Sequence, residues 1–349
     1  MSRFRESIDR LEAYVPGEQP QAGSKVIKLN TNENPYPPSP KAMKVLREFD
    51  GERLRLYPKP YADDVRLAVS RVLKVPPEWV LVGNGSDELL TMIMRSVAEP
   101  GRRVVFPTPT YVLYRTLAEI QQAEIVEAPF DDDYNLPVDA LQAADGAVTL
   151  IASPNSPSGT SAATGQVARL AEAARGLVVV DEAYVDFAED SALSLAARFD
   201  NVVILRSLSK GYSLAGLRIG FAVAQPRVVD GLSKVKDSYN VDAVACAAAA
   251  AAIDDQPHKN ANVSKVKASR AKLADALAGM GFAVWPSQAN FLLARPPAGD
   301  AERVYQTLKA RGILVRYFRE PRLDDKLRIS VGDDRQNAAL AAALGEIIR

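Results

Sequence analysis

The sequence predicts an α/β protein with a large domain built on a mostly parallel sheet and a smaller α+β domain. Between residues 80 and 223, short apolar stretches that suit buried strands alternate with helical patterns. Several of these stretches end in polar or glycine-containing loops, where sheets of this kind bind their ligands. After residue 236 the alternation gives way to long helical patterns and scattered strands. We therefore expect an N-terminal arm and pocket-lining segment at 1–50, a large domain at 51–236 and a small domain at 237–349.

The predicted sheet consists of short runs rich in valine, isoleucine and leucine, which favour buried strands. These runs are 80–82, 103–106, 124–128, 147–152, 177–180, 202–205 and 219–223. Helical patterns lie before, between and after them, at 63–73, 86–98, 112–121, 138–143, 165–174 and 228–235. Because strand and helix alternate along the chain, we expect neighbouring strands to run parallel, with helices covering both faces of the sheet.

The composition excludes several classes of function. Lys and Arg total 43 and Asp and Glu total 43, so no net charge attracts nucleic acid or an anionic membrane. The single Cys246 excludes an internal disulfide, and the single His258 disfavours histidine triads and most zinc sites. The most apolar stretch, Ala243–Ile253, is too short for a membrane span of ~20 residues, and the N-terminus lacks a signal-peptide core. We expect a cytoplasmic protein that acts on small molecules.

The N-terminal segment contains a short helical pattern and a proline-rich stretch. Phe4–Tyr14 is typical of a short amphipathic helix. Between residues 28 and 40, prolines forbid regular helix and fix an extended, polar path. This stretch is either the wall of a pocket or an ordinary linker. Tyr57 is held in an extended conformation by Pro58.

Two loops at strand ends in the first half of the sheet suit a phosphorylated, planar ligand. Gly83–Glu88 joins a strand to a helix, and such a turn presents free N–H groups and the positive end of the helix dipole to an anion. Ser86 is also a natural N-cap, and such turns are common without any ligand. Tyr111 follows the next strand, where its ring could stack on a planar ligand.

Asp181 lies at the carboxyl end of the apolar run 177–180 and should face the same crevice as Tyr111. A carboxylate in this position can pair with a protonated pyridine nitrogen and keep that nitrogen charged. Helix capping or an ordinary loop position is the alternative for this aspartate. Tyr184 follows closely in the same loop.

The loop between the last two strands, Ser207–Gly220, holds one lysine, several hydroxyls and one arginine. An unpaired ammonium is costly to bury, so Lys210 needs either a path to water or a chemical partner. Hydroxyls and an arginine, Arg218, are groups that would bind a phosphate. The combination suggests pyridoxal phosphate, which bonds a lysine amine through its aldehyde. A solvated loop lysine is the alternative.

The predicted small domain combines strands at 282–285, 290–294, 313–316 and 327–331 with helices at 300–311 and 334–348. Helical patterns at 243–253 and 262–280 lead into it. Arg316 and Arg328 stand at the ends of strands that are otherwise apolar. Each either extends outward to solvent or waits for an anion.

Taken together, these segments resemble the histidinol-phosphate aminotransferases, which belong to the fold-type I enzymes that use pyridoxal 5′-phosphate. The resemblance runs through nearly the whole chain. It rests on Leu29–Tyr36, Leu56–Pro58, Gly83–Glu88, Pro109–Tyr111, Ser153–Gly159, Asp181–Tyr184, Ser207–Lys210, Leu214–Arg218 and Leu327–Gly332.

The resemblance implies a role for each site residue. Lys210 would bond the cofactor aldehyde, Asp181 would pair with the ring nitrogen, and Tyr184 would bond the ring hydroxyl. Tyr111 would stack on the ring. The cofactor phosphate would be held by Ser86, Asp87, Ser207, Ser209 and Arg218, with Tyr57 reaching in from the neighbouring subunit of a homodimer, and Asn155 would be a further cofactor contact. Substrate would meet Asn32, Arg316 and Arg328.

One position departs from the family pattern. The family usually has asparagine directly before the second proline of the loop, where this chain has Ser156. Either Asn155 reaches the ring oxygen of the cofactor or Ser156 bonds it more weakly.

The resemblance implies transamination of L-histidinol phosphate with 2-oxoglutarate, giving imidazole-acetol phosphate and glutamate in histidine biosynthesis. An aromatic amino acid aminotransferase and a threonine-phosphate decarboxylase of the same fold are the close alternatives. The fold also occurs in transcription regulators, which carry a DNA-binding domain for which residues 1–24 are too short. A domain that binds another phosphate compound would leave Lys210, Asp181, Tyr184 and Tyr111 unexplained.

Overall fold

The computed structural model describes the chain except for residues 1, 13–16, 22, 24 and 349. A seven-stranded sheet forms the centre of the large domain, with strand order β2-β8-β7-β6-β5-β3-β4. Its strands are β2 (Val80–Asn84), β3 (Arg103–Thr108), β4 (Glu124–Pro129), β5 (Val148–Ala152), β6 (Leu177–Asp181), β7 (Val202–Ser207) and β8 (Ile219–Val223). The five strands from β4 to β7 run parallel, whereas β8 is antiparallel to both of its neighbours. The predicted α/β architecture with a mostly parallel sheet is confirmed.

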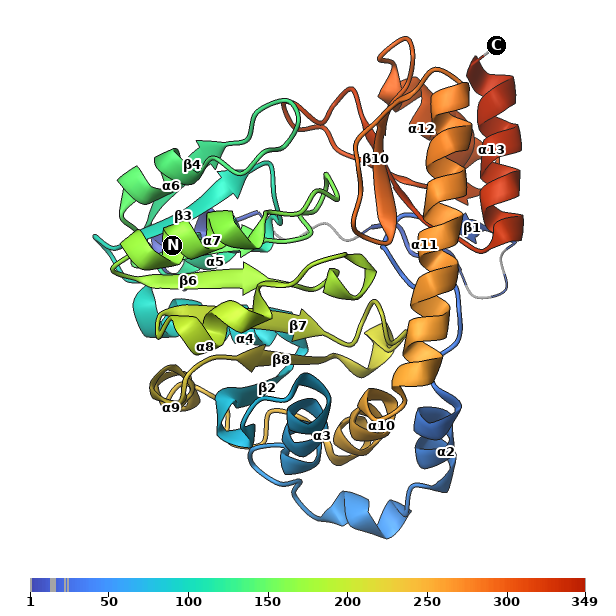
Figure 1. The fold of residues 1–349 in the computed structure, drawn as a ribbon. Coiled ribbons are helices and arrows are strands. Elements are labelled where there is room, and N and C mark those ends of the chain that lie inside the picture. The colour runs from blue at the N-terminus through green and yellow to red at the C-terminus, as the bar shows by residue number, and fades with distance from the viewer. Residues whose placement is uncertain (1, 13–16, 22, 24, 349) are drawn as a thin grey trace.

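Helices cover both faces of this sheet (Figure 1). They are α3 (Asp63–Leu73), α4 (Gly85–Val97), α5 (Leu113–Ile120), α6 (Val138–Ala144), α7 (Thr164–Ala173), α8 (Leu195–Arg198), α9 (Pro226–Ser233) and α10 (Ala243–Ile253). The central strands are apolar throughout because they are buried on both sides. Val178, Val180 and Ile204 belong to one hydrophobic cluster, and Val179 and Val203 belong to the cluster on the opposite face.

The small domain consists of a four-stranded antiparallel sheet and helices beside it. Its strands are β9 (Ala283–Val284), β10 (Phe291–Arg295), β12 (Arg316–Tyr317) and β13 (Leu327–Ser330), and its helices are α12 (Ala301–Ala310) and α13 (Asp334–Ile348). The predicted strand at 313–316 is divided: β11 (Ile313–Leu314) instead pairs with β1 (Ile27–Lys28). The long helix α11 (Gln256–Gly279) runs from the large domain to the small one (Figure 1).

The packing supports a different second domain boundary from the predicted one. Buried side chains of α10, among them Ala245, Cys246 and Ala249, belong to the same cluster as the sheet residues of the large domain. The helix also contacts α3 and α2 (Pro40–Glu48). We therefore propose that the large domain extends through α10 and that α11 forms the connection.

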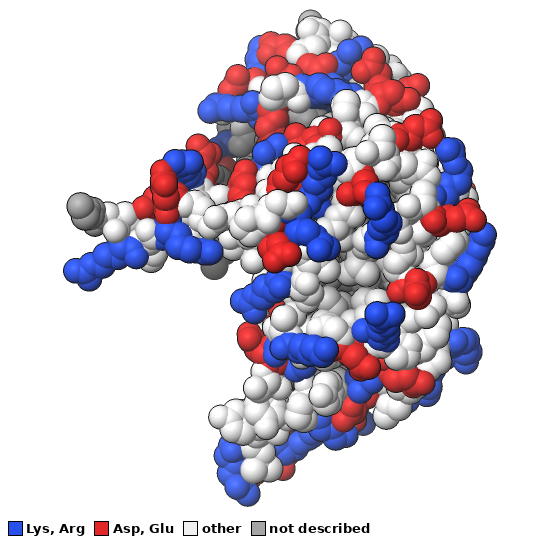
Figure 2. Space-filling view, turned by 90° about the vertical axis from the view of Figure 1, so that its left-hand side faces the viewer, with Lys and Arg blue, Asp and Glu red and all other residues white. Residues whose placement is uncertain are grey.

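The N-terminal segment is less helical than the sequence predicts. Within the described part of residues 4–14, the helix α1 is confined to Glu6–Asp9, and Tyr14 lies outside the described residues. Among the described residues, we find no helix long and apolar enough to cross a membrane. Figure 2 shows positive and negative side chains interspersed on one face of the molecule, as the balanced composition suggests.

Candidate functional site

A cavity of about 1060 Å³ lies between the carboxyl ends of the parallel strands and the small domain. Most of the predicted site residues line it. They are Asn32, Ser86, Asp87, Tyr111, Asp181, Tyr184, Ser207, Ser209, Lys210, Arg218, Arg316 and Arg328. Ser7 and Arg10 of the N-terminal arm also line it, which the sequence did not indicate. The remaining two, Asn155 and Tyr57, lie elsewhere.

Asp181 ends strand β6 at the buried floor of the cavity. The Tyr114 hydroxyl donates to its Oδ2 at 3.0 Å, and the Ala183 N–H donates to its Oδ1 at 3.1 Å. Burial raises the pKa of Asp181 to about 6, although these two hydrogen bonds act in the opposite direction. A carboxylate at this depth would gain from a cationic ring nitrogen beside it. Tyr114 was missed in the sequence because its position on α5 is that of a core residue.

Lys210 and Tyr184 meet at the wall formed by the proline-rich segment. Lys210 Nζ donates to the Thr31 carbonyl at 3.3 Å and lies 5.7 Å from the centroid of the Tyr184 ring. Asn32 Nδ2 donates to the Tyr184 hydroxyl at 3.0 Å, and Asn34 Nδ2 donates to the Lys210 carbonyl at 3.0 Å. Of the two interpretations of this segment, the contacts support the pocket wall.

A part of the cavity at the start of α4, which we call the anion cup, is shaped to accept an anion. Ser86 and Asp87 lie in the first turn of that helix, and Arg218 Nη2 bonds Asp87 Oδ2 at 2.9 Å. Strand β8 packs closely against the start of α4, since a Cβ at Gly220 would lie 2.5 Å from the Ser86 nitrogen. Only glycine lets β8 approach the helix N-terminus so closely.

Tyr111 contacts this cup through Asp87. Its hydroxyl donates to Asp87 Oδ1 at 3.1 Å, and its ring packs edge-on against Tyr114. Burial, together with the charge of Asp87, raises the pKa of Tyr111, so its hydroxyl stays protonated. A lysine amine, a buried acid, a tyrosine ring and an anion cup in one cavity fit pyridoxal phosphate.

Arg316 and Arg328 close the cavity from the small domain. They are directly opposite each other on the antiparallel strands β12 and β13, and both line the cavity. Like charges in this relation repel, and an anion between them would remove the repulsion. The Arg328 guanidinium also donates to the Asn30 carbonyl at 3.1 Å and lies 5.4 Å from the Phe291 ring centroid. Of the two interpretations, the anion site is favoured.

The loop 153–159 places Ser156, and not Asn155, at the cavity. Asn155 is buried: its Oδ1 accepts from Thr110 at 2.7 Å, and its Nδ2 donates to Pro109 and Ser158. This arrangement does not favour the predicted contact between Asn155 and the cofactor, because both the oxygen and the nitrogen of the Asn155 amide are already hydrogen-bonded within the protein. Ser156 lines the cavity and accepts a hydrogen bond from Arg328 at 2.9 Å.

Tyr57 lies away from the cavity of its own chain. The residue is 81% exposed, and its ring stacks on that of Tyr239, with centroids 4.5 Å apart. Leu54, Leu56 and Tyr61 nearby are also more than half exposed. A large apolar group this exposed is typical of an interface.

The chain matches known proteins along nearly its whole length. Residues 24–344 match the model of the aminotransferase class I and II family. A histidinol-phosphate aminotransferase of Trichormus variabilis is 57% identical over 99% of both chains, and one of Citrifermentans bemidjiense is 43% identical over 99% of both. The crystal structure of the Sinorhizobium meliloti histidinol-phosphate aminotransferase in complex with pyridoxal-5′-phosphate superposes with a TM-score of 0.92 at 29% identity, covering 100% of this chain and 98% of that one.

The residues of the cavity and these relatives agree on the cofactor, which is pyridoxal 5′-phosphate. The lysine, the buried acid and the anion cup are the groups that this cofactor requires. The chain belongs to the histidinol-phosphate aminotransferases, within the class I and II aminotransferase family.

Proposed function

We propose that this chain transfers the amino group of L-histidinol phosphate to 2-oxoglutarate, giving imidazole-acetol phosphate and glutamate in histidine biosynthesis in the cytoplasm. The observation that carries the proposal is the single cavity that Lys210 and Asp181 share with the opposed Arg316 and Arg328. Both substrates carry an anionic group at a distance from the reacting carbon. One pair of arginines can therefore hold the phosphate of the first and a carboxylate of the second.

Bound pyridoxal phosphate supplies an electron sink for the bonds of the amine-bearing carbon. We assign the proton transfers at that carbon to Lys210 Nζ, which the Thr31 carbonyl holds on the Tyr184 side of the cavity. Tyr184, which Asn32 fixes, would bond the ring hydroxyl and so orient the ring. Asp181 would hold a positive charge on the ring nitrogen, and Ser86, Ser207, Ser209 and Arg218 would bind the cofactor phosphate.

A single-turnover experiment tests the substrate. The enzyme loaded with cofactor is mixed with histidinol phosphate or with phenylalanine, and the loss of the cofactor's visible absorption is followed. We expect histidinol phosphate to react at least about ten times faster at equal, subsaturating concentration, because only it offers a dianion to the arginines. Faster reaction with phenylalanine would identify an aromatic aminotransferase. Release of carbon dioxide from threonine phosphate would identify a decarboxylase.

Arg328→Lys is expected to raise KM for both histidinol phosphate and 2-oxoglutarate by about 10- to 100-fold, because a lysine cannot form the planar, two-point contact. Steady-state kinetics with each substrate varied in turn measures the change. Arg295→Lys is the matched control, since Arg295 ends the adjacent strand β10 and does not line the cavity. If only one of the two KM values rises, the two substrates do not share the arginine site.

We also propose that the chain works as a homodimer in which Tyr57 completes the neighbouring subunit's site. The exposed apolar group formed by Leu54, Leu56, Tyr57, Tyr61 and Tyr239 supports this proposal. Mixing Lys210→Ala with Tyr57→Ala subunits, after partial denaturation and refolding, is expected to restore activity. Half of the random dimers are mixed, and each of these holds one intact site, so about a quarter of wild-type activity should return.

Activity of the mixture is measured at limiting cofactor, where the loss of a phosphate contact is most apparent. Refolding each variant alone is the control. Recovery no greater than the sum of the two separate activities would mean that each site is built from one chain. Full activity of Tyr57→Ala by itself would remove Tyr57 from the site.

A further inference from the structure

A buried ion pair lies directly behind the cofactor cavity. Arg206 Nη2 is 2.9 Å from Glu182 Oε2, and Arg206 Nε also donates to that oxygen at 3.0 Å. The Glu182 side chain is 2% exposed and that of Arg206 is 15% exposed. Neither residue lines the cavity. Burying two charges costs desolvation free energy, so the question is what a buried ion pair at this position contributes to the protein.

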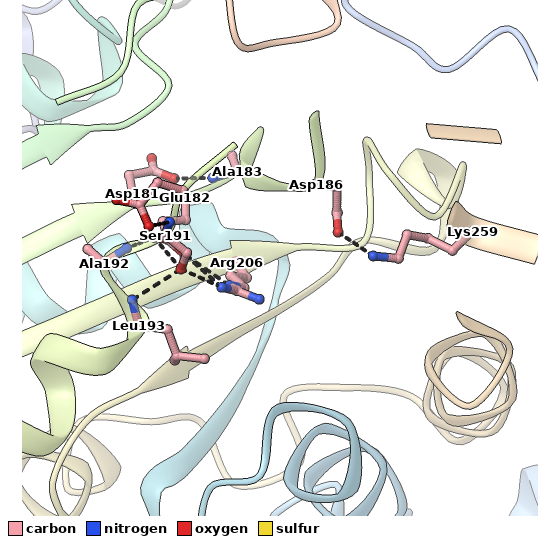
Figure 3. Close-up of polar contacts among 10 residues, drawn as sticks. Asp181, Glu182, Ala183, Asp186, Ser191, Ala192, Leu193, Arg206 and Lys259 are labelled. Carbon is pink, nitrogen blue, oxygen red and sulfur yellow. Dashed lines mark hydrogen bonds and ion pairs between the residues drawn. The ribbon is translucent and has the colours of Figure 1, made fainter. Parts of the chain in front are cut away.

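The pair is embedded in a network that fixes the Glu182 carboxylate (Figure 3). The Ser191 hydroxyl donates to Glu182 at 2.9 Å and accepts from Arg206 Nη2 at 2.8 Å. The Ala192 N–H donates to Glu182 Oε1 at 2.6 Å. Every polar atom of this carboxylate therefore has a donor, which is the condition under which a buried charge is tolerated.

The two residues are each one position from a proposed cofactor ligand. Glu182 is the first residue after β6, directly following Asp181, and Arg206 precedes Ser207 on β7. Side chains alternate between the faces of a strand. Asp181 and Ser207 therefore point to the cavity face, whereas Glu182 and Arg206 point to the reverse face.

The ion pair ties the two strands where their backbone pairing ends. Asp181 is in register with Leu205, and the Glu182 N–H donates to the Leu205 carbonyl at 2.8 Å. The chains then separate into the loops that carry Tyr184 and Lys210. A fork-shaped guanidinium on a fixed carboxylate restricts both the spacing and the twist of the two strand ends.

We propose that Glu182 and Arg206 are positioning residues, which clamp the ends of β6 and β7 from the reverse face and so hold Asp181 and Ser207 at the spacing that the cofactor needs. Asp181 would meet one end of the cofactor, at its ring nitrogen, and Ser207 would help to bind the other end, at its phosphate. A change in the spacing between the two strand ends would therefore weaken both contacts together. This proposal rests on the roles proposed above for Asp181 and Ser207.

A second buried ion pair nearby provides a control. Lys259 Nζ of α11 is 2.9 Å from Asp186 Oδ1, with side chains that are 14% and 12% exposed. Figure 3 shows it apart from the Glu182–Arg206 pair. It joins the loop after Tyr184 to α11 and does not connect the two strands. Its loss should cost stability without moving Asp181 relative to Ser207.

The experiment measures cofactor affinity by titrating apoprotein with pyridoxal phosphate, together with the visible circular dichroism of the bound cofactor and the melting temperature of the apoprotein. The variants are Glu182→Gln, Arg206→Met, the double variant and Lys259→Met. We expect the first two to weaken cofactor binding by about 10- to 100-fold and to reduce the circular dichroism. The double variant should lose no more cofactor affinity than the more strongly affected single variant, because either substitution alone breaks the same ion pair. Lys259→Met should lower the melting temperature yet keep the affinity within about twofold.

Affinity and circular dichroism that stay at wild-type values in folded Glu182→Gln and Arg206→Met would overturn the proposal, and so would additive losses in the double variant. Where Arg206→Met does not fold, Arg206→Lys replaces it. Arg206→Lys keeps the positive charge but lacks the two-pronged guanidinium. Unchanged cofactor affinity in both Arg206→Lys and Glu182→Gln would also overturn the proposal. Asp181→Asn is titrated in parallel: if it too binds the cofactor normally, the proposed role of Asp181 fails, rather than the clamp alone.

Discussion

Lys210→Met is expected to lower the rate of transamination by about 10⁴-fold, the largest effect of any single substitution in this protein. In the proposed function this lysine both attaches the cofactor and moves the proton, and no other lysine lines the cavity among the described residues. The variant should still bind pyridoxal phosphate, because the anion cup and Asp181 are untouched. Reduction with borohydride followed by peptide mass spectrometry should find the cofactor mass on Lys210 in the wild type and on no peptide of the variant.

Lys28→Met is the matched control for this experiment. Lys28 is a partly buried lysine of β1 that pairs with Glu33, next to the same wall segment, but does not line the cavity. It should retain the covalently bound cofactor and most of its activity. A reducible attachment that persists in Lys210→Met would place the covalent bond on another residue and contradict the assignment.

The sequence predicted the residues that follow strands better than it predicted their partners. Asp181, Tyr111 and Lys210 are recognisable because a parallel sheet presents the carboxyl ends of its strands at one edge, and each follows a clear apolar run. Their positions thus follow from local pattern and one rule of topology. The direction of β8 was not predictable in the same way, because an apolar run carries no signal of parallel or antiparallel pairing.

Contacts between segments that are far apart in the chain could not be predicted from the sequence. Asn32 and Tyr184 are 152 residues apart, and Arg328 meets Ser156 across 172 residues. Each of these bonds depends on how two domains pack, for which no local pattern exists. Glu182 was hidden for another reason: it is adjacent to a recognisable functional residue, but its side chain points to the opposite face of the sheet.

Asp181→Asn is expected to show opposite effects on function and on the stability of the apoprotein. Activity should fall by about 10³-fold or more, since a neutral amide cannot stabilise a positive ring nitrogen. Apoprotein stability should rise. Burial raises the pKa of Asp181 from 3.8 to about 6, so the folded state binds a proton more tightly than the unfolded state does. The wild type therefore loses stability as the pH increases from about 4 to about 6, and the asparagine variant does not.

Urea unfolding of the two apoproteins between pH 4 and pH 8 measures this difference. The unfolding free energy of the Asp181→Asn apoprotein should exceed that of the wild type only slightly at pH 4. The difference should grow up to about pH 6.5 and then remain constant at about 1–3 kcal/mol. Asp139→Asn is the control, because that carboxylate is exposed and should change the unfolding free energy by less than about 0.5 kcal/mol at every pH. An advantage for Asp181→Asn that does not depend on pH would show that the carboxylate is not desolvated. The expected result would mean that the buried charge of Asp181 lowers the stability of the apoprotein until the cofactor binds. The same substitution should therefore stabilise the apoprotein and inactivate the cofactor-bound enzyme.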